Sequence, residues 1–288
     1  MFDVIIIGKG PAGISSALYT LRANLKTLII GKNSLLEKAS SIENYYGILS
    51  IAGKDLLKTG EEQVLRLGGE IIEDEVIDIK IENNIKRIIT KDNVFTAKSV
   101  LIAVGDKKTR VNIDNLNKFE GRGISYCTVC DGFFFKDLKV GVLGYNDYAV
   151  NEALELLNFT NDVTIYTNGK ELELTDKYKI NIDKFKVNKE EIKKFEGVDE
   201  LNKICFNNGE EENIDGIFIA FGSANSNTIA KKIGLIEMDN HILVDNEAKT
   251  NVDGIFAAGD CTGGFKQISV AVGQGAIAGN SIIKYINK

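Results

Sequence analysis

The chain has 288 residues, enough for two domains of about 100 to 200 residues each. Hydrophobic residues make up 44% and charged residues 26%, which is typical of a protein with a packed core and argues against a disordered chain. The net charge of −6 gives the molecule no overall attraction to nucleic acid, and the single histidine, His241, argues against a histidine-based zinc site or a Ser-His-Asp hydrolase.

The apolar stretches are short. The longest, such as VIIIG near the start and GIFIAFG at 216–222, are the size of strands and well below the roughly 20 residues that cross a bilayer. The first residues, MFDVIIIGKG, run directly into a buried-strand pattern without the basic region and cleavage site of a secretory signal. We therefore expect a cytoplasmic protein that binds neither membranes nor nucleic acid.

Residues 1–31 predict a strand, a helix and a second strand. FDVIII and KTLII are continuous apolar runs, typical of strands that are buried on both faces. Between them, ISSALYTLRA has apolar residues at helical spacing. Pro11 stands where the first turn of this helix begins, and there its missing N–H costs no hydrogen bond.

The remaining chain predicts a second set of the same elements. Residues 70–104 alternate short apolar runs with polar breaks, which predicts a small antiparallel sheet and a strand that returns to the first core. A second strand-helix-strand pattern begins at LKVGVLG, and residues 170–206 are β-like and rich in lysine. GIFAAGD and the apolar stretch after it predict one more strand and a long helix that returns to the first domain.

These elements predict an α/β fold with two Rossmann-like nucleotide-binding domains. We expect a discontinuous domain of residues 1–113 and 243–288, and an inserted domain of residues 114–242.

The sequence GKGPAG places Gly8, Gly10 and Gly13 between a predicted strand and a predicted helix. In that context the first glycine permits a tight turn, the second lets backbone approach a pyrophosphate, and the third lets the helix pack on the strand. The pattern favours a dinucleotide site over an ordinary tight turn. The carboxylate that usually follows about 20 residues later and binds a ribose hydroxyl is replaced by Gly31 and Lys32, so this contact must come from elsewhere.

The corresponding turn of the second unit, GYNDYA, is altered. Gly144 keeps the first role and Ala149 can serve the third, but Asn146 puts a side chain where backbone would have to touch a pyrophosphate. Asp147 adds a negative charge at the helix N-terminus, where it would repel a phosphate. No arginine pair follows the next strand to bind a 2′-phosphate. We expect a Rossmann domain that does not bind NADPH.

Cys127 and Cys130 form a CxxC motif, and Asp131 follows at once. This spacing can close a small disulfide ring and favours the thiolate of the more exposed sulfur, which can attack another disulfide. A zinc site would need two more ligands, whereas Cys205 and Cys261 are isolated in the sequence, so we interpret these two as structural thiols and expect no metal. Asp131 is placed to exchange a proton with a leaving thiolate, unless it only caps a turn or a helix.

The ordered set of motifs resembles the low-molecular-weight thioredoxin reductases, and the similarity covers nearly the whole chain. GKGPAG is followed by ENYYG at 43–47, by GRGISYCTVCDG at 121–132, and by GIFAAGD at 254–260. The resemblance implies the fold of a flavin disulfide reductase, with a three-layer ββα FAD domain and a smaller inserted domain that carries the CxxC. It also implies a homodimer and a rotation of one domain against the other during turnover.

The resemblance also implies roles for individual residues. FAD would lie along the first glycine turn, Asn44 would stand near the flavin, and Asp260 would bond the ribityl chain. Cys130 would face the flavin, Cys127 would attack thioredoxin, and Asp131 would be the catalytic acid. The expected cofactor-binding residues are Gly8, Gly10, Pro11, Ala12, Gly13, Asn44, Gly105, Gly259, Asp260, Lys266, Gln267 and Ile268.

The chain departs from the family's pattern in its NADPH-binding turn, in the basic motif downstream of that turn, and in its shorter length. What remains resembles the ferredoxin-dependent flavin thioredoxin reductases, whose FAD receives single electrons from reduced ferredoxin. Lys266 replaces an arginine that is common before Gln267. Low-potential ferredoxins at about −400 mV lie about 130 mV below thioredoxin at about −270 mV, so a two-electron transfer is downhill by about 6 kcal/mol. We therefore expect a thioredoxin reductase with ferredoxin as its donor.

Three alternatives keep the CxxC: an NADPH-dependent reductase that tolerates the altered turn, an FAD-dependent oxidase of small dithiols, and a non-catalytic flavin redox sensor. A local excess of positive charge could steer an acidic ferredoxin, although a solvated charged face explains it equally well. Its lysines are Lys177, Lys179, Lys184, Lys186, Lys189, Lys193 and Lys194. Lys107, Lys108 and Arg110 form a second candidate.

Overall fold

The computed structural model describes residues 1–32, 34–105, 111–221, 230–238 and 241–288. It divides into two compact units: unit 1 is Met1–Lys107 with Asn225–Lys288, and unit 2 is Lys108–Ala224. The sequence placed the end of the inserted domain at residue 242. The structure differs there because this part of the chain bonds to unit 1: the Ile236 amide donates to Asn251 Oδ1 at 2.8 Å, and Lys232 Nζ lies 3.6 Å from Asp78 Oδ1.

Unit 1 is built on a mixed sheet with the strand order β3-β2-β1-β6-β5-β4, in which β17 also pairs with β6. The strands are β1 (Phe2–Ile7), β2 (Thr27–Ile30), β3 (Glu70–Ile72), β4 (Val76–Glu82), β5 (Ile85–Thr90), β6 (Val94–Ile102) and β17 (Ile255–Ala257). β1 pairs in parallel with β2 and β6, whereas β5 is antiparallel to both β4 and β6. The predicted antiparallel segment and its returning strand are confirmed.

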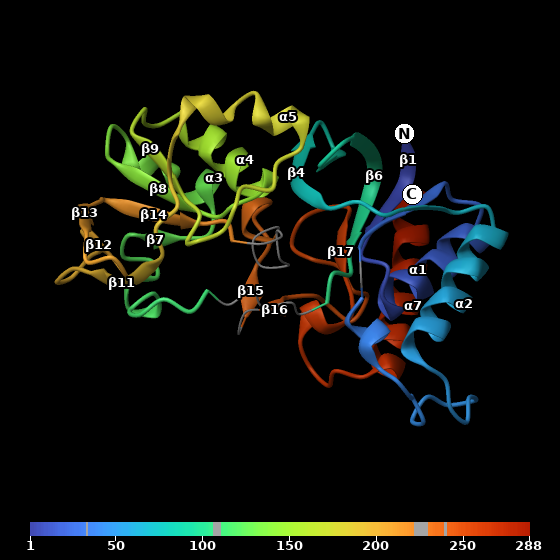
Figure 1. The fold of residues 1–288 in the computed structure, drawn as a ribbon. Helices are drawn as coiled ribbons and strands as arrows, with labels where there is room; N and C mark the ends of the chain where they lie inside the picture. Colours follow the sequence, from blue (N-terminus) through green and yellow to red (C-terminus); the bar gives the residue numbers. More distant parts are fainter. Residues whose placement is uncertain (33, 106–110, 222–229, 239–240) are drawn as a thin grey trace. The chain divides into compact units, whose positions relative to one another are not determined.

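Three of the helices described in unit 1 are α1 (Pro11–Arg22), α2 (Gly53–Arg66) and α7 (Ile268–Ile286), and both α2 and α7 pack against α1 (Figure 1). α7 packs closely along α1 through two small residues one turn apart. A Cβ on Gly275 would lie 2.2 Å from the Ala12 carbonyl oxygen, and one on Gly279 would lie 2.9 Å from that of Ser16. The C-terminal helix is thereby fixed against the helix that follows the first glycine turn, as the sequence predicted.

Tyr285 fixes the end of α7. Its hydroxyl donates to Asp253 Oδ2 at 2.8 Å, and its ring meets that of Phe256 edge-on with 6.0 Å between the centroids. Burial and the hydrogen bond to Asp253 raise the pKa of Tyr285 to about 12. Unit 1 also contains shorter elements: the 3₁₀ turns η1 (Leu35–Lys38) and η5 (Asp260–Thr262), and the antiparallel pair β15 (Glu237–Met238) and β16 (His241–Ile242).

Unit 2 has a parallel sheet with the order β10-β9-β8-β14-β7. Its strands are β7 (Ile124–Ser125), β8 (Val140–Leu143), β9 (Val163–Tyr166), β10 (Lys186–Asn188) and β14 (Gly216–Ile219). Its helical elements are α3 (Thr128–Asp131), α4 (Asp147–Leu156), α5 (Asp176–Lys179), η2 (Asn117–Phe119), η3 (Gly132–Phe135) and η4 (Ile182–Lys184). The second strand-helix-strand unit is thus confirmed as β8-α4-β9.

An antiparallel sheet of β11 (Ile192–Glu196), β12 (Lys203–Phe206) and β13 (Glu211–Asn213) covers the second core. Phe119, Phe195 and Ile217 lie fully buried in this core. The β-like prediction for 170–206 is wrong over residues 176–184, where α5 and η4 form, and right for the strands that follow. Within the described residues, no helix is long and apolar enough to cross a membrane.

Candidate functional site

Two glycines of the GKGPAG motif, Gly8 in the turn after β1 and Gly13 in α1, leave no room for a side chain. Gly8 has φ +115°, and a Cβ on it would lie 2.2 Å from the Ala103 carbonyl oxygen just beyond β6. A Cβ on Gly13 would lie 2.0 Å from the Gly8 carbonyl oxygen. These contacts match the tight turn and the helix-on-strand packing predicted for the first and third glycines.

Gly10 is a glycine for a different reason. Among the described residues, a Cβ on it would meet only Ser34 Oγ at 3.7 Å, and its backbone is ordinary extended chain with φ −83° and ψ −177°. It is the N-cap of α1, which has no side-chain cap, and Pro11 follows in the first turn. Packing within the protein does not require glycine at this position. A pyrophosphate bound at the open N-terminus of α1 would require it, because the phosphates approach the bare backbone. The turn therefore fits a dinucleotide.

The carboxyl end of β17 meets the same turn. Gly259 has φ +84°, and a Cβ on it would lie 3.0 Å from the Ala12 Cβ. Its amide donates to Gln274 Oε1 of α7 at 2.8 Å, and Asp260 follows as the first residue of η5. Gly105, with φ +71°, follows β6 closely. Ligands of open parallel sheets bind outside the carboxyl ends of the strands, so these residues are in the expected place for FAD.

A hydrogen bond joins the segment around 44 to the start of α7. Asn44 Nδ2 donates to Gln267 Oε1 at 3.0 Å, although the two residues are 223 positions apart. Lys266 is exposed, and Ile268 begins α7. Two of the residues that the family resemblance assigns to the cofactor, Asn44 and Gln267, are therefore in direct contact.

Cys127 and Cys130 form a disulfide at the start of α3, with their Cα atoms 5.3 Å apart. The Cys130 amide donates to Cys127 Sγ at 3.2 Å, and the Asp131 amide donates to the Cys127 carbonyl oxygen at 3.1 Å, so one helical turn brings the sulfurs and the carboxylate together. Cys127 is 2% exposed, whereas Cys130 is exposed. The cysteine expected to attack thioredoxin is thus the buried one of the pair.

Ser125 anchors this turn, and the sequence analysis missed it. Its hydroxyl donates to Asp131 Oδ2 at 2.6 Å and accepts a hydrogen bond from the Cys127 amide at 3.0 Å. Ser125 is the last residue of β7 and is 6% exposed. A buried hydroxyl that bonds a carboxylate holds that carboxylate in one place. The only signal in the sequence is a serine two residues before the CxxC.

Glu152 is a second residue that the sequence analysis missed. It is 2% exposed on α4, and its carboxylate Oε2 lies 2.5 Å from Thr128 Oγ1 within the CxxC. A buried carboxylate that bonds a hydroxyl ties two elements together firmly, because leaving either group unpaired is costly. This bond fastens the redox helix α3 to α4. The available signal in the sequence was a charged residue, Glu152, at a helix position whose spacing predicts a buried side chain.

Large apolar side chains are exposed next to the disulfide. Val129 is 57% exposed, Phe133 69% and Phe134 72%, and the two phenylalanine rings meet edge-on at 6.2 Å. Neighbouring exposed aromatics are typical of surfaces that bind another molecule. The run FFF after the CxxC was the available signal.

The chain itself hydrogen-bonds to the second nucleotide turn. Asn146 Oδ1 accepts from the Ala149 amide at 3.4 Å and caps α4. Asp147 is fully buried, and its Oδ1 accepts from the Thr175 amide at 2.8 Å. The Glu173 amide donates to the Tyr145 carbonyl oxygen at 2.8 Å, so residues 173–175 bond directly to the turn.

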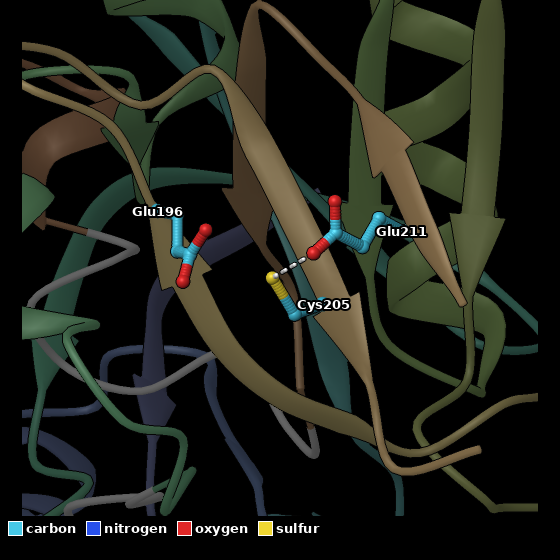
Figure 2. A group of neighbouring side chains, drawn as sticks. All are labelled: Glu196, Cys205 and Glu211. Carbon is cyan, nitrogen blue, oxygen red and sulfur yellow. Dashed lines mark hydrogen bonds between the residues drawn. The ribbon is translucent and has the colours of Figure 1, made fainter. Parts of the chain in front are cut away.

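A cysteine and two carboxylates gather on the small sheet of unit 2, as Figure 2 shows for Glu196, Cys205 and Glu211. Cys205 Sγ lies 4.0 Å from Glu211 Oε1, and burial together with the two carboxylates raises the pKa of its thiol. Each carboxylate also bonds a lysine: Lys194 lies 2.5 Å from Glu196, and Lys203 lies 2.7 Å from Glu211. The group is therefore a small ion-pair network around a protonated thiol.

The lysine-rich segment carries less free charge than its sequence suggests. Lys179 pairs with Asp176 at 2.9 Å, and Lys189 pairs with Glu171 at 2.7 Å. The second basic candidate, Lys107, Lys108 and Arg110, lies outside the described residues.

Comparisons with known proteins agree with this geometry. The family model for pyridine nucleotide-disulphide oxidoreductases matches residues 2–275. The thioredoxin reductases of Bacillus subtilis and Listeria monocytogenes are 32% and 33% identical; each match covers 100% of this chain, and 96% and 95% of the relatives.

Solved structures give the same answer. The atypical thioredoxin reductase TRi of Desulfovibrio vulgaris Hildenborough superimposes with a TM-score of 0.95 at 38% identity, over 100% of this chain and 98% of that one. A ferredoxin-flavin thioredoxin reductase of Clostridium acetobutylicum gives a TM-score of 0.70 at 30% identity, over 100% and 99%. The chain belongs to the pyridine nucleotide-disulphide oxidoreductase family and, within it, to the thioredoxin reductases, which are FAD-binding flavoproteins.

Proposed function

We propose that this thioredoxin reductase takes its electrons from reduced ferredoxin and passes them through FAD to the Cys127–Cys130 disulfide and on to thioredoxin. One observation carries the choice of donor: the groups of the nucleotide turn of unit 2 are hydrogen-bonded by the chain's own side chains and backbone.

The altered turn opposes NADPH in three ways. A pyrophosphate needs a bare backbone at the second glycine position, where Asn146 now caps the helix. It also needs the positive end of α4, where the buried carboxylate of Asp147 already binds the Thr175 amide. A 2′-phosphate needs a basic partner after β9, and Tyr166, Thr167 and Asn168 stand there. Together these features support a domain that no longer binds a nicotinamide nucleotide.

Ferredoxin is favoured as the alternative donor on two grounds. The Clostridium acetobutylicum relative is described as a ferredoxin-flavin thioredoxin reductase. The transfer from a low-potential ferredoxin to thioredoxin is also downhill by about 6 kcal/mol for two electrons. The docking surface for ferredoxin, the homodimer and the cytoplasmic location stay predictions.

The thiol chemistry follows from the geometry around α3. FAD, when bound, supplies the two electrons that reduce the disulfide. Two electrons and two protons convert the Cys127–Cys130 bond into two thiols. Cys127, deprotonated, attacks the thioredoxin disulfide and forms a mixed disulfide, while the departing thioredoxin thiolate takes a proton.

The second half of the exchange regenerates the chain's disulfide. Cys130 attacks the Cys127 sulfur, the intermolecular bond breaks, and thioredoxin leaves with two thiols. Asp131, held by Ser125 at 2.6 Å, is the group that moves the proton to the leaving thiolate. The exposed Val129, Phe133 and Phe134 supply the surface on which thioredoxin docks.

Donor identity is tested by anaerobic titration of the FAD-loaded protein. Reduced ferredoxin should bleach the flavin absorbance and support many turnovers of thioredoxin reduction, whereas stoichiometric NADPH should leave the flavin oxidised. The double variant with serine at both Cys127 and Cys130 is the control, since ferredoxin should still bleach its flavin without any thioredoxin being reduced. Rapid bleaching by micromolar NADPH would overturn the proposed donor.

The roles of the two sulfurs are tested by trapping. Cys130→Ser leaves Cys127 able to form the mixed disulfide and nothing to resolve it, so a covalent adduct with thioredoxin should accumulate and be visible by mass spectrometry. Cys127→Ser should give no such adduct. Adduct formation by Cys127→Ser alone would reverse the two roles, and it is the outcome that exposure by itself favours.

A further inference from the structure

The first nucleotide turn lacks the carboxylate that usually binds the adenosine ribose. In Rossmann units this acid stands at the carboxyl end of the second strand and accepts hydrogen bonds from the ribose hydroxyls. Here Gly31 and Lys32 follow β2. Gly31 is required by packing, because a Cβ on it would lie 2.9 Å from the Lys9 amide nitrogen. The second strand is therefore pressed against the glycine turn and offers no acid of its own.

A carboxylate reaches the same place from the neighbouring strand. β3 pairs in parallel with β2, which pairs in parallel with β1, so the three carboxyl ends share one edge of the sheet. Glu73 comes directly after β3, and Lys9 lies within the glycine turn after β1. Lys9 Nζ lies 2.7 Å from Glu73 Oε1 and 3.2 Å from Glu61 Oε1 of α2.

The bridge between Lys9 and Glu73 has the features of a positioned ligand group. Lys9 is 8% exposed, whereas the Glu73 side chain is 74% exposed, so the lysine is fixed in the protein and presents the carboxylate outward. Burial acts against the charge of Lys9, but its bonds to Glu73 and Glu61 outweigh it and raise the pKa of Lys9. The bond to Lys9 lowers the pKa of Glu73, so this carboxylate stays an acceptor at neutral pH.

We infer that Glu73, anchored by Lys9, replaces the missing acid and accepts hydrogen bonds from the adenosine ribose hydroxyls of FAD. The inference rests on FAD being the cofactor and adds a residue that the motif does not contain. The acid thus follows the third strand instead of the second, and Lys9 of the glycine turn holds Glu73 beside that turn.

The test compares FAD with its analogue that lacks both adenosine ribose hydroxyls, the 2′,3′-dideoxyadenosine form. Dissociation constants come from the loss of flavin fluorescence when apoprotein is added, a measurement independent of turnover. The unaltered protein should bind the analogue about 10- to 100-fold more weakly than FAD, as expected for lost hydrogen bonds to a charged group. Glu73→Gln should weaken FAD binding and should distinguish the analogue less than the unaltered protein does, because an amide oxygen accepts hydrogen bonds more weakly than a carboxylate.

Glu75→Gln is the matched control. It makes the same charge change two residues away, where Glu75 pairs with Lys32 at 3.6 Å and with Lys91 at 3.9 Å. It should bind FAD within about twofold of the unaltered protein and keep the preference for FAD, because the Glu75 carboxylate is 17% exposed and pairs with Lys32 and Lys91 instead of the lysine of the glycine turn. Lys9→Met, which keeps Glu73 but removes its anchor, is a second variant and should also weaken FAD.

Each result decides the inference. Native FAD affinity in Glu73→Gln, a preserved preference for FAD over the analogue in that variant, or a loss of preference in Glu75→Gln would overturn it. Failure of the unaltered apoprotein to bind FAD at all would instead overturn the cofactor itself. Circular dichroism of the apoproteins separates a lost contact from a lost fold.

Discussion

Replacing Ser125 with alanine should loosen the Asp131 carboxylate without changing either cysteine. The change removes the hydrogen bond to Asp131 Oδ2 at 2.6 Å and leaves the Cys127 amide without its partner at 3.0 Å. An unpaired buried amide costs about 1 to 3 kcal/mol, and a hydrogen bond to a charged group contributes about 1.5 to 3 kcal/mol. Asp131 is half-buried, so water can replace the lost hydroxyl as its hydrogen-bond partner and offset part of this cost. We therefore expect the free energy of unfolding to fall by about 2 to 4 kcal/mol.

The effect on turnover is separable from the effect on stability. If Ser125 acts by holding Asp131, Ser125→Ala should lower kcat for thioredoxin reduction about 10- to 100-fold with little change in KM, since proton transfer by a positioned group contributes about 10²- to 10⁴-fold. Ser125→Thr, which keeps the hydroxyl, should restore most of the rate.

A double-mutant cycle with Asp131→Asn decides the mechanism. In that background the serine substitution should change kcat by no more than about twofold, because the proton-transfer group is already lost. An equal loss of rate with and without the Asp131 carboxylate would refute the positioning role, and so would an unchanged free energy of unfolding for Ser125→Ala.

Three further predictions follow from the geometry. Gly10→Ala should leave the thermal unfolding of the apoprotein nearly unchanged but lower the FAD content of the purified protein. Gly13→Ala should prevent folding, because the new Cβ would lie 2.0 Å from a carbonyl oxygen. Equal melting curves for the two variants would contradict this. Alanine at both Phe133 and Phe134 should raise KM for thioredoxin about 10-fold or more and leave reduction of a small aromatic disulfide unchanged, since interface aromatics contribute more than about 1 kcal/mol each; equal losses with both substrates would argue against a docking surface. Tyr285 should titrate near pH 12 in the difference absorbance between the native protein and Tyr285→Phe. Because its pKa is raised from 10.0 to about 12 in the folded state, its contribution to stability should be complete below pH 10 and disappear between pH 10 and 12. A normal tyrosine titration would contradict this prediction.

Local sequence patterns predict much of the fold. Buried parallel strands such as β1 are visible as continuous apolar runs, and Pro11 marks the start of the helix after the glycine turn. Both signals can be recognised because the preferences for strand and for a helix start depend on neighbouring residues alone. The contacts of Gly8 and Gly13 match their predicted roles because the spacing GxGxxG already encodes a strand, a turn and a helix. The pattern fails where α5 and η4 replace predicted strand, since lysine favours helix over strand.

The residues that support the candidate site could not be found in the same way. Glu152 bonds Thr128 from 24 positions away, and Thr175 bonds Asp147 from 28. Nothing in a local window distinguishes these residues from solvent-exposed polar ones, because their role depends on burial and on a partner that only packing supplies.

The sequence by itself determined the chemistry of this protein, since a disulfide, a neighbouring carboxylate and a dinucleotide turn each require particular residues at a particular spacing. Only the tertiary structure decided how that chemistry is held: Ser125 on Asp131, Lys9 on Glu73, and Asn44 on Gln267 across 223 positions. The physical reason is that reactivity belongs to short motifs, whereas position and charge state depend on groups that the folded chain brings together from distant segments.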